Sequence, residues 1–144
     1  MQDLPYDFYV TATAEEEGNV LLKAEDVPRL VTAPFAGDGG PTNQWCPEML
    51  VVAAVTDGFV VGFRAICRTA KFDWHTIDCK AAGTLNRVDR VNRFTHFRLE
   101  ATLAVPRGAD TDKARRLMEK AQASCAVANS LNATVELQIE IVEE

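Results

Sequence analysis

The stretch that most constrains this fold is residues 46–63, CPEMLVVAAVTDGFVVGF, which begins like a capped helix and then becomes almost wholly apolar. Pro47 suits the first position of a helix, where its missing N–H costs nothing, and Glu48 favours the positive end of the helix dipole. Cys46 would then be the N-cap residue. The pattern predicts a long helix that starts at residue 47 and is built for burial.

The polar residues of this helix form one narrow seam. Asp57, Arg64, Arg68 and Lys71 recur at spacings of seven, four and three, while every other face of the helix is apolar. A lone chain of 144 residues does not easily cover such a helix on most sides, so we predict a homodimer. The stretch 49–67 nearly reaches the length of a transmembrane span, but the charges within it favour a core helix of a protein that does not enter membranes.

The centre of the helix is interrupted by Thr56, Asp57 and Gly58. A glycine in a helix interior costs about 1 kcal/mol relative to alanine, and a buried acid without a partner costs more. We therefore expect Asp57 and Gly58 to line a cavity at the dimer interface, where the missing side chain of the glycine leaves room. In the alternative interpretation Asp57 faces solvent, together with Arg64 and Arg68.

The rest of the chain alternates between strand and helix patterns. Residues 6–14 show the period-two alternation of a half-buried strand, and residues 93–105 carry apolar side chains on one face and polar ones on the other. An apolar stripe along residues 112–129 is typical of an amphipathic helix. Further strands are expected at 20–24, 29–33, 73–85 and 133–143, with a loop at 34–45 and a polar turn at 86–92. This order predicts an α+β fold in which residues 1–144 form one domain.

Composition and charge narrow the classes of function. A net charge of −6 argues against binding to nucleic acid or anionic membranes, since like charges repel. The chain opens without the regions of a signal peptide, so we expect a cytoplasmic protein with reduced cysteines. The cysteines form no CxxC pair, and His75 and His96 fall on predicted strands without metal-ligand spacing, so we expect no metal and no cofactor. Neither Ser124 nor Ser130 lies in a nucleophile elbow, which excludes a serine hydrolase.

Thiols and carboxylates remain as chemical candidates. At the helix N-terminus the dipole and the free N–H groups would favour the thiolate of Cys46, and the alternative is a plain cap of no chemical consequence. Cys125 lies on the apolar stripe, where a small buried hydrophobe is the alternative. Glu48 and Asp57 are candidate acids or bases, because apolar surroundings disfavour the charged form of a carboxyl group, as a general base often needs.

Two segments resemble the OsmC/Ohr family of osmotically inducible and organic hydroperoxide resistance proteins. The segment GGPTNQWCPEMLVVAAVTDGF is similar to the family's Gly-rich loop, N-P-E-x-L motif and A-A-x-x-x-x-C-F run, and AQASCAVANSL looks like its R-C-P-V-S-N-x-L motif. The order of the predicted elements extends this resemblance over nearly the whole chain. It implies antiparallel sheets packed around a long buried central helix and a second helix, in an intertwined homodimer with its site at the subunit interface.

The resemblance also implies a role in the oxidative stress response. In that family a peroxidatic cysteine of the central helix attacks an organic hydroperoxide, becomes a sulfenic acid and condenses with a resolving cysteine. An arginine of the N-terminal sheet and the glutamate of the P-E motif polarise the thiolate and the peroxide. Here the glutamate falls on Glu48 and the resolving cysteine on Cys125, but Gly58 stands where the peroxidatic cysteine is expected. No arginine lies in the first turn, EEEGN at 15–19, and the earliest in the chain is Arg29.

Three hypotheses follow from this degenerate site. The one we favour is a protein without peroxidase activity that binds a small apolar or hydroperoxide-like ligand at the dimer interface. The second is a thiol peroxidase or redox sensor that uses a relocated cysteine, Cys46 or Cys125. The third is a different acid–base reaction in the same pocket, carried by Glu48 or Asp57.

Overall fold

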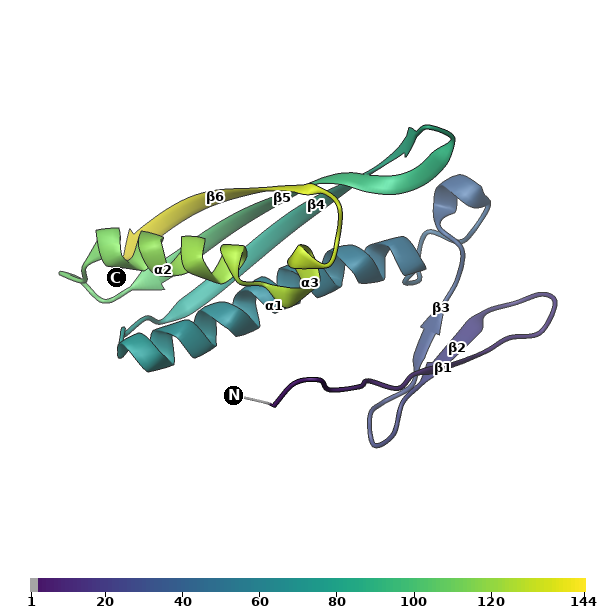
Figure 1. The fold of residues 1–144 in the computed structure, drawn as a ribbon, viewed down its shortest axis with the longest axis horizontal. Coiled ribbons are helices and arrows are strands. Elements are labelled where there is room, and N and C mark those ends of the chain that lie inside the picture. The colour runs from purple at the N-terminus through teal and green to yellow at the C-terminus, as the bar shows by residue number, and fades with distance from the viewer. Residues whose placement is uncertain (1–2) are drawn as a thin grey trace. The chain divides into compact units, whose positions relative to one another are not determined.

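The computed structural model describes residues 3–144, which divide into two compact units, one ending at Leu50 and the other running Val51–Glu144. The first unit is a small antiparallel sheet of three strands in the order β1-β2-β3, followed by a short 3-10 helix (Figure 1). Its elements are β1 (Thr11–Thr13), β2 (Val20–Lys23), β3 (Leu30–Thr32) and η1 (Ala36–Asp38).

The first predicted strand is much shorter than the alternation of residues 6–14 indicated. Only Thr11–Thr13 pairs, with Thr11 opposite Lys23, and the side chains of Phe8 and Tyr9 are more than four-fifths exposed. The prediction of a strand over residues 6–10 is wrong for the single chain, because period-two alternation stabilises a strand only where a neighbour accepts its hydrogen bonds and covers one face. The strands predicted at 20–24 and 29–33 are confirmed.

The predicted long helix is α1 (Pro47–Ala70). The backbone N–H of Leu50 donates to the carbonyl oxygen of Cys46 at 3.1 Å, which places Cys46 at the N-cap position, as predicted. Length and composition alone would allow α1 to span a membrane. A stripe of its residues at every fourth position is instead fully buried in the core of the second unit: Val55, Phe59, Phe63 and Cys67.

The second unit contains a three-stranded sheet in the order β4-β5-β6, with α1 and the later helices on one face (Figure 1). Its strands are β4 (Thr76–Val88), β5 (Val91–Val105) and β6 (Thr134–Glu143). The polar turn predicted over 86–92 is only two residues, Asp89 and Arg90, both with positive φ, as the tightest hairpin turns require. The predicted faces of β5 are confirmed, since Phe97, Leu99 and Leu103 are fully buried.

The α+β class is confirmed, with one difference in the sheet of the second unit. β4 and β5 are antiparallel, but β5 and β6 are parallel, so this sheet is mixed. The reason is the crossover between β5 and β6, which contains α2 (Thr111–Ala123) and α3 (Ala126–Asn129) and returns the chain to the end where β5 began. The single helix predicted over 112–129 is therefore two, with a break at Ser124 and Cys125.

Close approach of α1 to the sheet explains the glycine in β4. A Cβ atom on Gly83 would lie 2.7 Å from Cγ2 of Val52 and 3.0 Å from Cε1 of Phe97, both closer than packed carbon atoms tolerate. The ring of Phe97 in turn stacks on Phe94, with centroids 5.1 Å apart. The helix can lie this near to the sheet only because residue 83 has no side chain.

Candidate functional site

The start of α3 packs against the middle of α1, at the interruption formed by Thr56, Asp57 and Gly58. A Cβ atom on Gly58 would lie 2.9 Å from Sγ of Cys125 and 3.7 Å from Cγ2 of Val127. Cys125 is the N-cap residue of α3, and its side chain is 6% exposed. The two positions that the resemblance pairs, 58 and 125, are thus in direct contact, and the space that a side chain of residue 58 would fill is occupied by a thiol.

The other two residues of the interruption are accommodated separately. The hydroxyl of Thr56 donates to the carbonyl oxygen of Val52 at 2.7 Å, so its polarity is satisfied within the helix. Asp57 is exposed in the single chain, as the solvent-facing alternative predicts. An acid–base role for Asp57 needs a desolvated carboxyl group, and within one chain this group stays in water.

The remaining predicted site residues lie at the start of α1, in the first unit. Cys46 is 4% exposed, and its neighbour Trp45 accepts a hydrogen bond from the backbone N–H of Ala33 at 2.9 Å, which holds the entry to the helix against β3. Glu48 is half-buried, and its Oε1 atom is buried without any hydrogen-bond partner among residues 3–144. A buried carboxylate oxygen without a donor is unusual and calls for a partner.

All four thiols are free, and none lies on an exposed residue. Burial raises the pKa of Cys67 to about 11 from an ordinary value of 9.0. Burial likewise raises the pKa of Cys79 to about 11. Since the thiolate is the nucleophile in thiol chemistry, burial of these two thiols favours a packing role for them.

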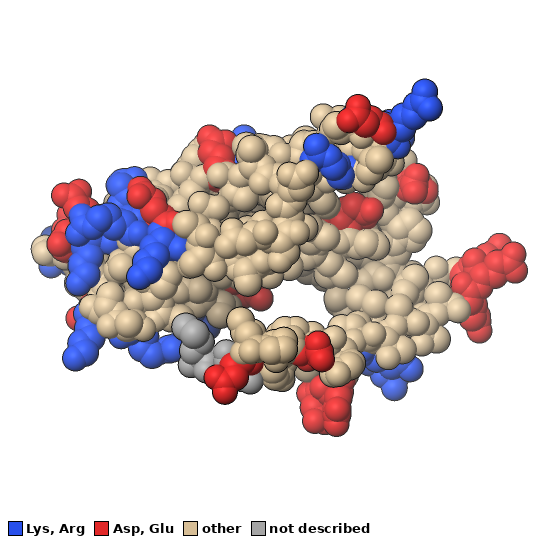
Figure 2. All heavy atoms as spheres, in the orientation of Figure 1, with Lys and Arg blue, Asp and Glu red and all other residues tan. Residues whose placement is uncertain are grey.

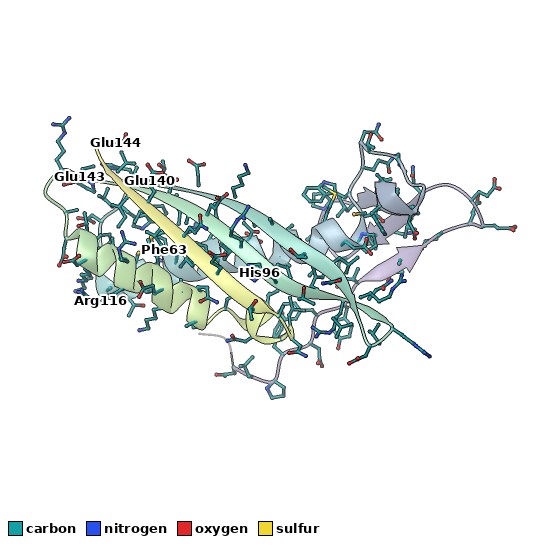
Figure 3. The ribbon with its side chains drawn as sticks, turned by 90° about the horizontal axis from the view of Figure 1, so that it is seen from above. Phe63, His96, Arg116, Glu140, Glu143 and Glu144 are labelled. Atoms are coloured by element: carbon teal, nitrogen blue, oxygen red, sulfur yellow. The ribbon has the colours of Figure 1, made fainter. Side chains whose placement is uncertain are left out.

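The histidines are surface residues. Nδ1 of His96 lies 2.7 Å from the hydroxyl of Thr134, and its Nε2 lies 3.4 Å from a carboxylate oxygen of Glu136. Figure 3 looks onto the outer face of the sheet, which carries His96 on β5 and Glu140 on the neighbouring β6. His75 is exposed and precedes β4 rather than lying on a strand. Within residues 3–144 no three His, Cys, Asp or Glu side chains gather as a metal site would require.

Sequence reasoning missed some residues that the structure places at these positions. Val127 is the second side chain against Gly58, and Asp38 of η1 lines the same hollow of the first unit as Glu48. Val127 falls within the quoted segment AQASCAVANSL, but the motif did not indicate its contact with Gly58, and no motif marks Asp38. Both are set by the path of a loop or short helix, which local sequence patterns do not encode.

The fold and the site together define a class of protein. It is an α+β protein in which the middle of a long central helix, at Gly58, contacts the thiol of Cys125 at the start of another helix. The family model described as "OsmC-like protein" matches residues 37–140 of this chain. The chain therefore belongs to the OsmC family.

Known relatives agree with this assignment. The chain is 32% identical over 107 residues to peroxiredoxin OsmC of Escherichia coli K12, covering 74% of this chain and 71% of that protein. An OsmC-like protein of unknown function from Vibrio cholerae superposes with a TM-score of 0.86 at 13% identity, over 94% of this chain and 99% of the other. An organic hydroperoxide resistance protein OsmC from Legionella pneumophila gives 0.77 at 21% identity, over 96% and 99%. At these identities the two structures establish the fold.

Proposed function

We propose that this protein is a member of the OsmC family that does not reduce hydroperoxides and instead binds a small apolar ligand at the interface of a homodimer. One observation carries the proposal: the thiol of Cys125 rests against Gly58, the residue that stands where the motif resemblance expects the peroxidatic cysteine. Attack on a peroxide needs a thiolate within reach of the substrate oxygen, and a glycine supplies no nucleophile. Cys125, which the resemblance identifies as the resolving cysteine, therefore has no peroxidatic cysteine at position 58 with which to form a disulfide.

The dimer in this proposal is supported by apolar surface that a single chain leaves open. Along α1, Val61 is 50% exposed, and Ala54 and Ala65 are exposed as well. In the N-terminal segment, Phe8 and Tyr9 are 85% and 81% exposed. A long helix buried along one stripe only, together with exposed aromatic residues, fits a surface that a second copy covers.

A relocated thiol is the second candidate, because relatives of this chain carry the names peroxiredoxin and organic hydroperoxide resistance protein. The burial of the two candidate sulfurs argues against it. Cys46 is 4% exposed and Cys125 is 6% exposed, so a hydroperoxide would have to open the structure to reach either thiol. We therefore favour a protein without peroxidase activity over one that uses a relocated thiol.

The test is consumption of cumene hydroperoxide with a dithiol reductant. We expect the wild-type protein to show no turnover above that of the reductant alone. If turnover is found, the variants Cys46→Ser and Cys125→Ser locate the nucleophile, and loss of activity in one of them establishes the relocated thiol in place of our proposal. Turnover that survives both substitutions would exclude both candidates.

A further inference from the structure

We propose that a hollow in the first unit, bordered by the start of α1, binds a small organic cation with an apolar body. The hollow has a volume of about 270 Å³, and it is lined by Val20, Thr32, Ala33, Pro34, Phe35, Asp38, Pro47 and Glu48. Most of this lining is apolar, and the two charged side chains are both acids. Such a combination, an apolar wall with a few polar groups, is typical of small-molecule sites.

The feature that points to a ligand is the carboxylate of Glu48. Its Oε1 atom is buried and has no hydrogen-bond partner among residues 3–144. An unpaired buried acceptor is costly, and for an ionised group more so, because it has given up its hydrogen bonds to water. A donor that enters the hollow from outside would satisfy this oxygen, and an ammonium or guanidinium group does so with opposite charge.

The charge of the first unit favours a cation over a neutral donor. Residues 1–50 contain nine acidic residues but only two basic ones, Lys23 and Arg29. Acidic side chains stand out from the end of the β1–β2 hairpin (Figure 2). The N-terminus of α1 carries about half a positive charge, which is less than the two negative charges of Asp38 and Glu48. The net field in the hollow therefore attracts cations.

The apolar lining decides between an organic and an inorganic cation. A hard metal ion prefers a shell of six or more oxygen ligands, and the walls formed by Val20, Pro34 and Phe35 supply none from their side chains. The same walls favour contact with an alkyl or aromatic group, and the ring of Phe35 adds a surface for a cation. An alkyl- or arylammonium ion thus matches both parts of the hollow.

The proposal is tested by titrating the protein of residues 1–144 with benzylammonium chloride, followed by calorimetry and by amide chemical shifts. Benzyl alcohol is the neutral isostere, and magnesium chloride is the inorganic cation. We expect benzylammonium to bind at least about tenfold more tightly than benzyl alcohol, because the charged hydrogen bond is lost in the alcohol. Shifts should be confined to the lining, including the amides of Val20 and Ala33.

Substitutions distinguish binding of benzylammonium in the hollow from its nonspecific attraction to acidic residues on the surface. Glu48→Gln should weaken benzylammonium binding about tenfold or more. Glu25→Gln, the same change at an exposed position of the same unit, should leave it unchanged. If Glu48→Gln does not fold, Asp38→Asn, at an exposed residue that borders the hollow, should weaken binding in the same direction.

Three results would overturn the proposal: equal affinity for benzyl alcohol, unchanged affinity in the Glu48 and Asp38 variants, or tighter binding of magnesium than of benzylammonium. The inference goes beyond the proposed function and does not rest on it. Hydroperoxide turnover reports on thiols, whereas this titration reports on carboxylates. Either proposal can therefore fail while the other stands.

Discussion

The substitution Gly58→Cys restores the atom that the family's chemistry needs and tests the contact between α1 and α3. A Cβ atom at position 58 would lie 2.9 Å from Sγ of Cys125. In a disulfide, the Cβ of one cysteine lies about 3 Å from the sulfur of the other, as the bond lengths and angles of the bridge require. Mild oxidation with diamide should therefore form a 58–125 disulfide with little movement of the backbone.

The expected effect on stability follows from the length of the closed loop. A cross-link between residues 58 and 125 removes loop-closure entropy from the unfolded chain worth about 4 kcal/mol in the chain-entropy model. For a chain of this size, that corresponds to a rise of roughly 10 °C in the unfolding midpoint of the oxidised relative to the reduced variant. Before oxidation the variant should fold, because replacing a mid-helix glycine by cysteine gains about 0.3 kcal/mol of helix propensity and the crowding falls on a side-chain atom.

The assay is peptide mass spectrometry after oxidation, together with calorimetry of both redox forms. Gly62→Cys is the matched control on the same helix, because a Cβ there would lie 4.0 Å from the carbonyl oxygen of Ala121 and near no thiol. Turnover of hydroperoxide should stay poor in Gly58→Cys, since Asp57 beside the new thiol opposes its ionisation. Two results would refute this geometry and the alignment built on it. One is the absence of a 58–125 disulfide in Gly58→Cys, and the other is a 62–125 disulfide that forms in Gly62→Cys at equal yield.

Three further predictions follow from the packing. The protein should sediment as a dimer at micromolar concentration, and a folded monomer would contradict the proposed covering of α1. Burial raises the pKa values of Cys67 and Cys79 from 9.0 to about 11, so these thiols ionise at a lower pH in the unfolded chain than in the folded one. The free energy of unfolding should therefore fall as the pH rises from about 9 towards 11. Cys67→Ala should make this fall less steep in denaturant titrations at a series of pH values. Gly83→Ala should destabilise the fold by about 1–3 kcal/mol in urea denaturation, because the methyl group would meet Val52 and Phe97, and no loss would mean that α1 can move away from β4.

The sequence by itself determined the elements that depend on local chemistry. Pro47 and Glu48 fixed the start of α1, and the alternation of β5 fixed which of its side chains are buried, because both patterns follow from the geometry of one element and the apolarity of its faces. The quoted motifs likewise identified the family from the residues alone. They paired Gly58 with Cys125 by resemblance, without saying how far apart the two residues lie.

Only the tertiary structure decided the relations between elements. The parallel pairing of β6 with β5, the break between α2 and α3, and the 2.9 Å approach of the thiol to Gly58 all depend on the path of the crossover. The same holds for the unpaired oxygen of Glu48 and for residues 6–10, whose strand pattern finds no partner among residues 3–144. Periodicity reports which face of a segment is apolar, but the neighbour that covers this face comes from elsewhere in the chain, or from another molecule, and is chosen by packing.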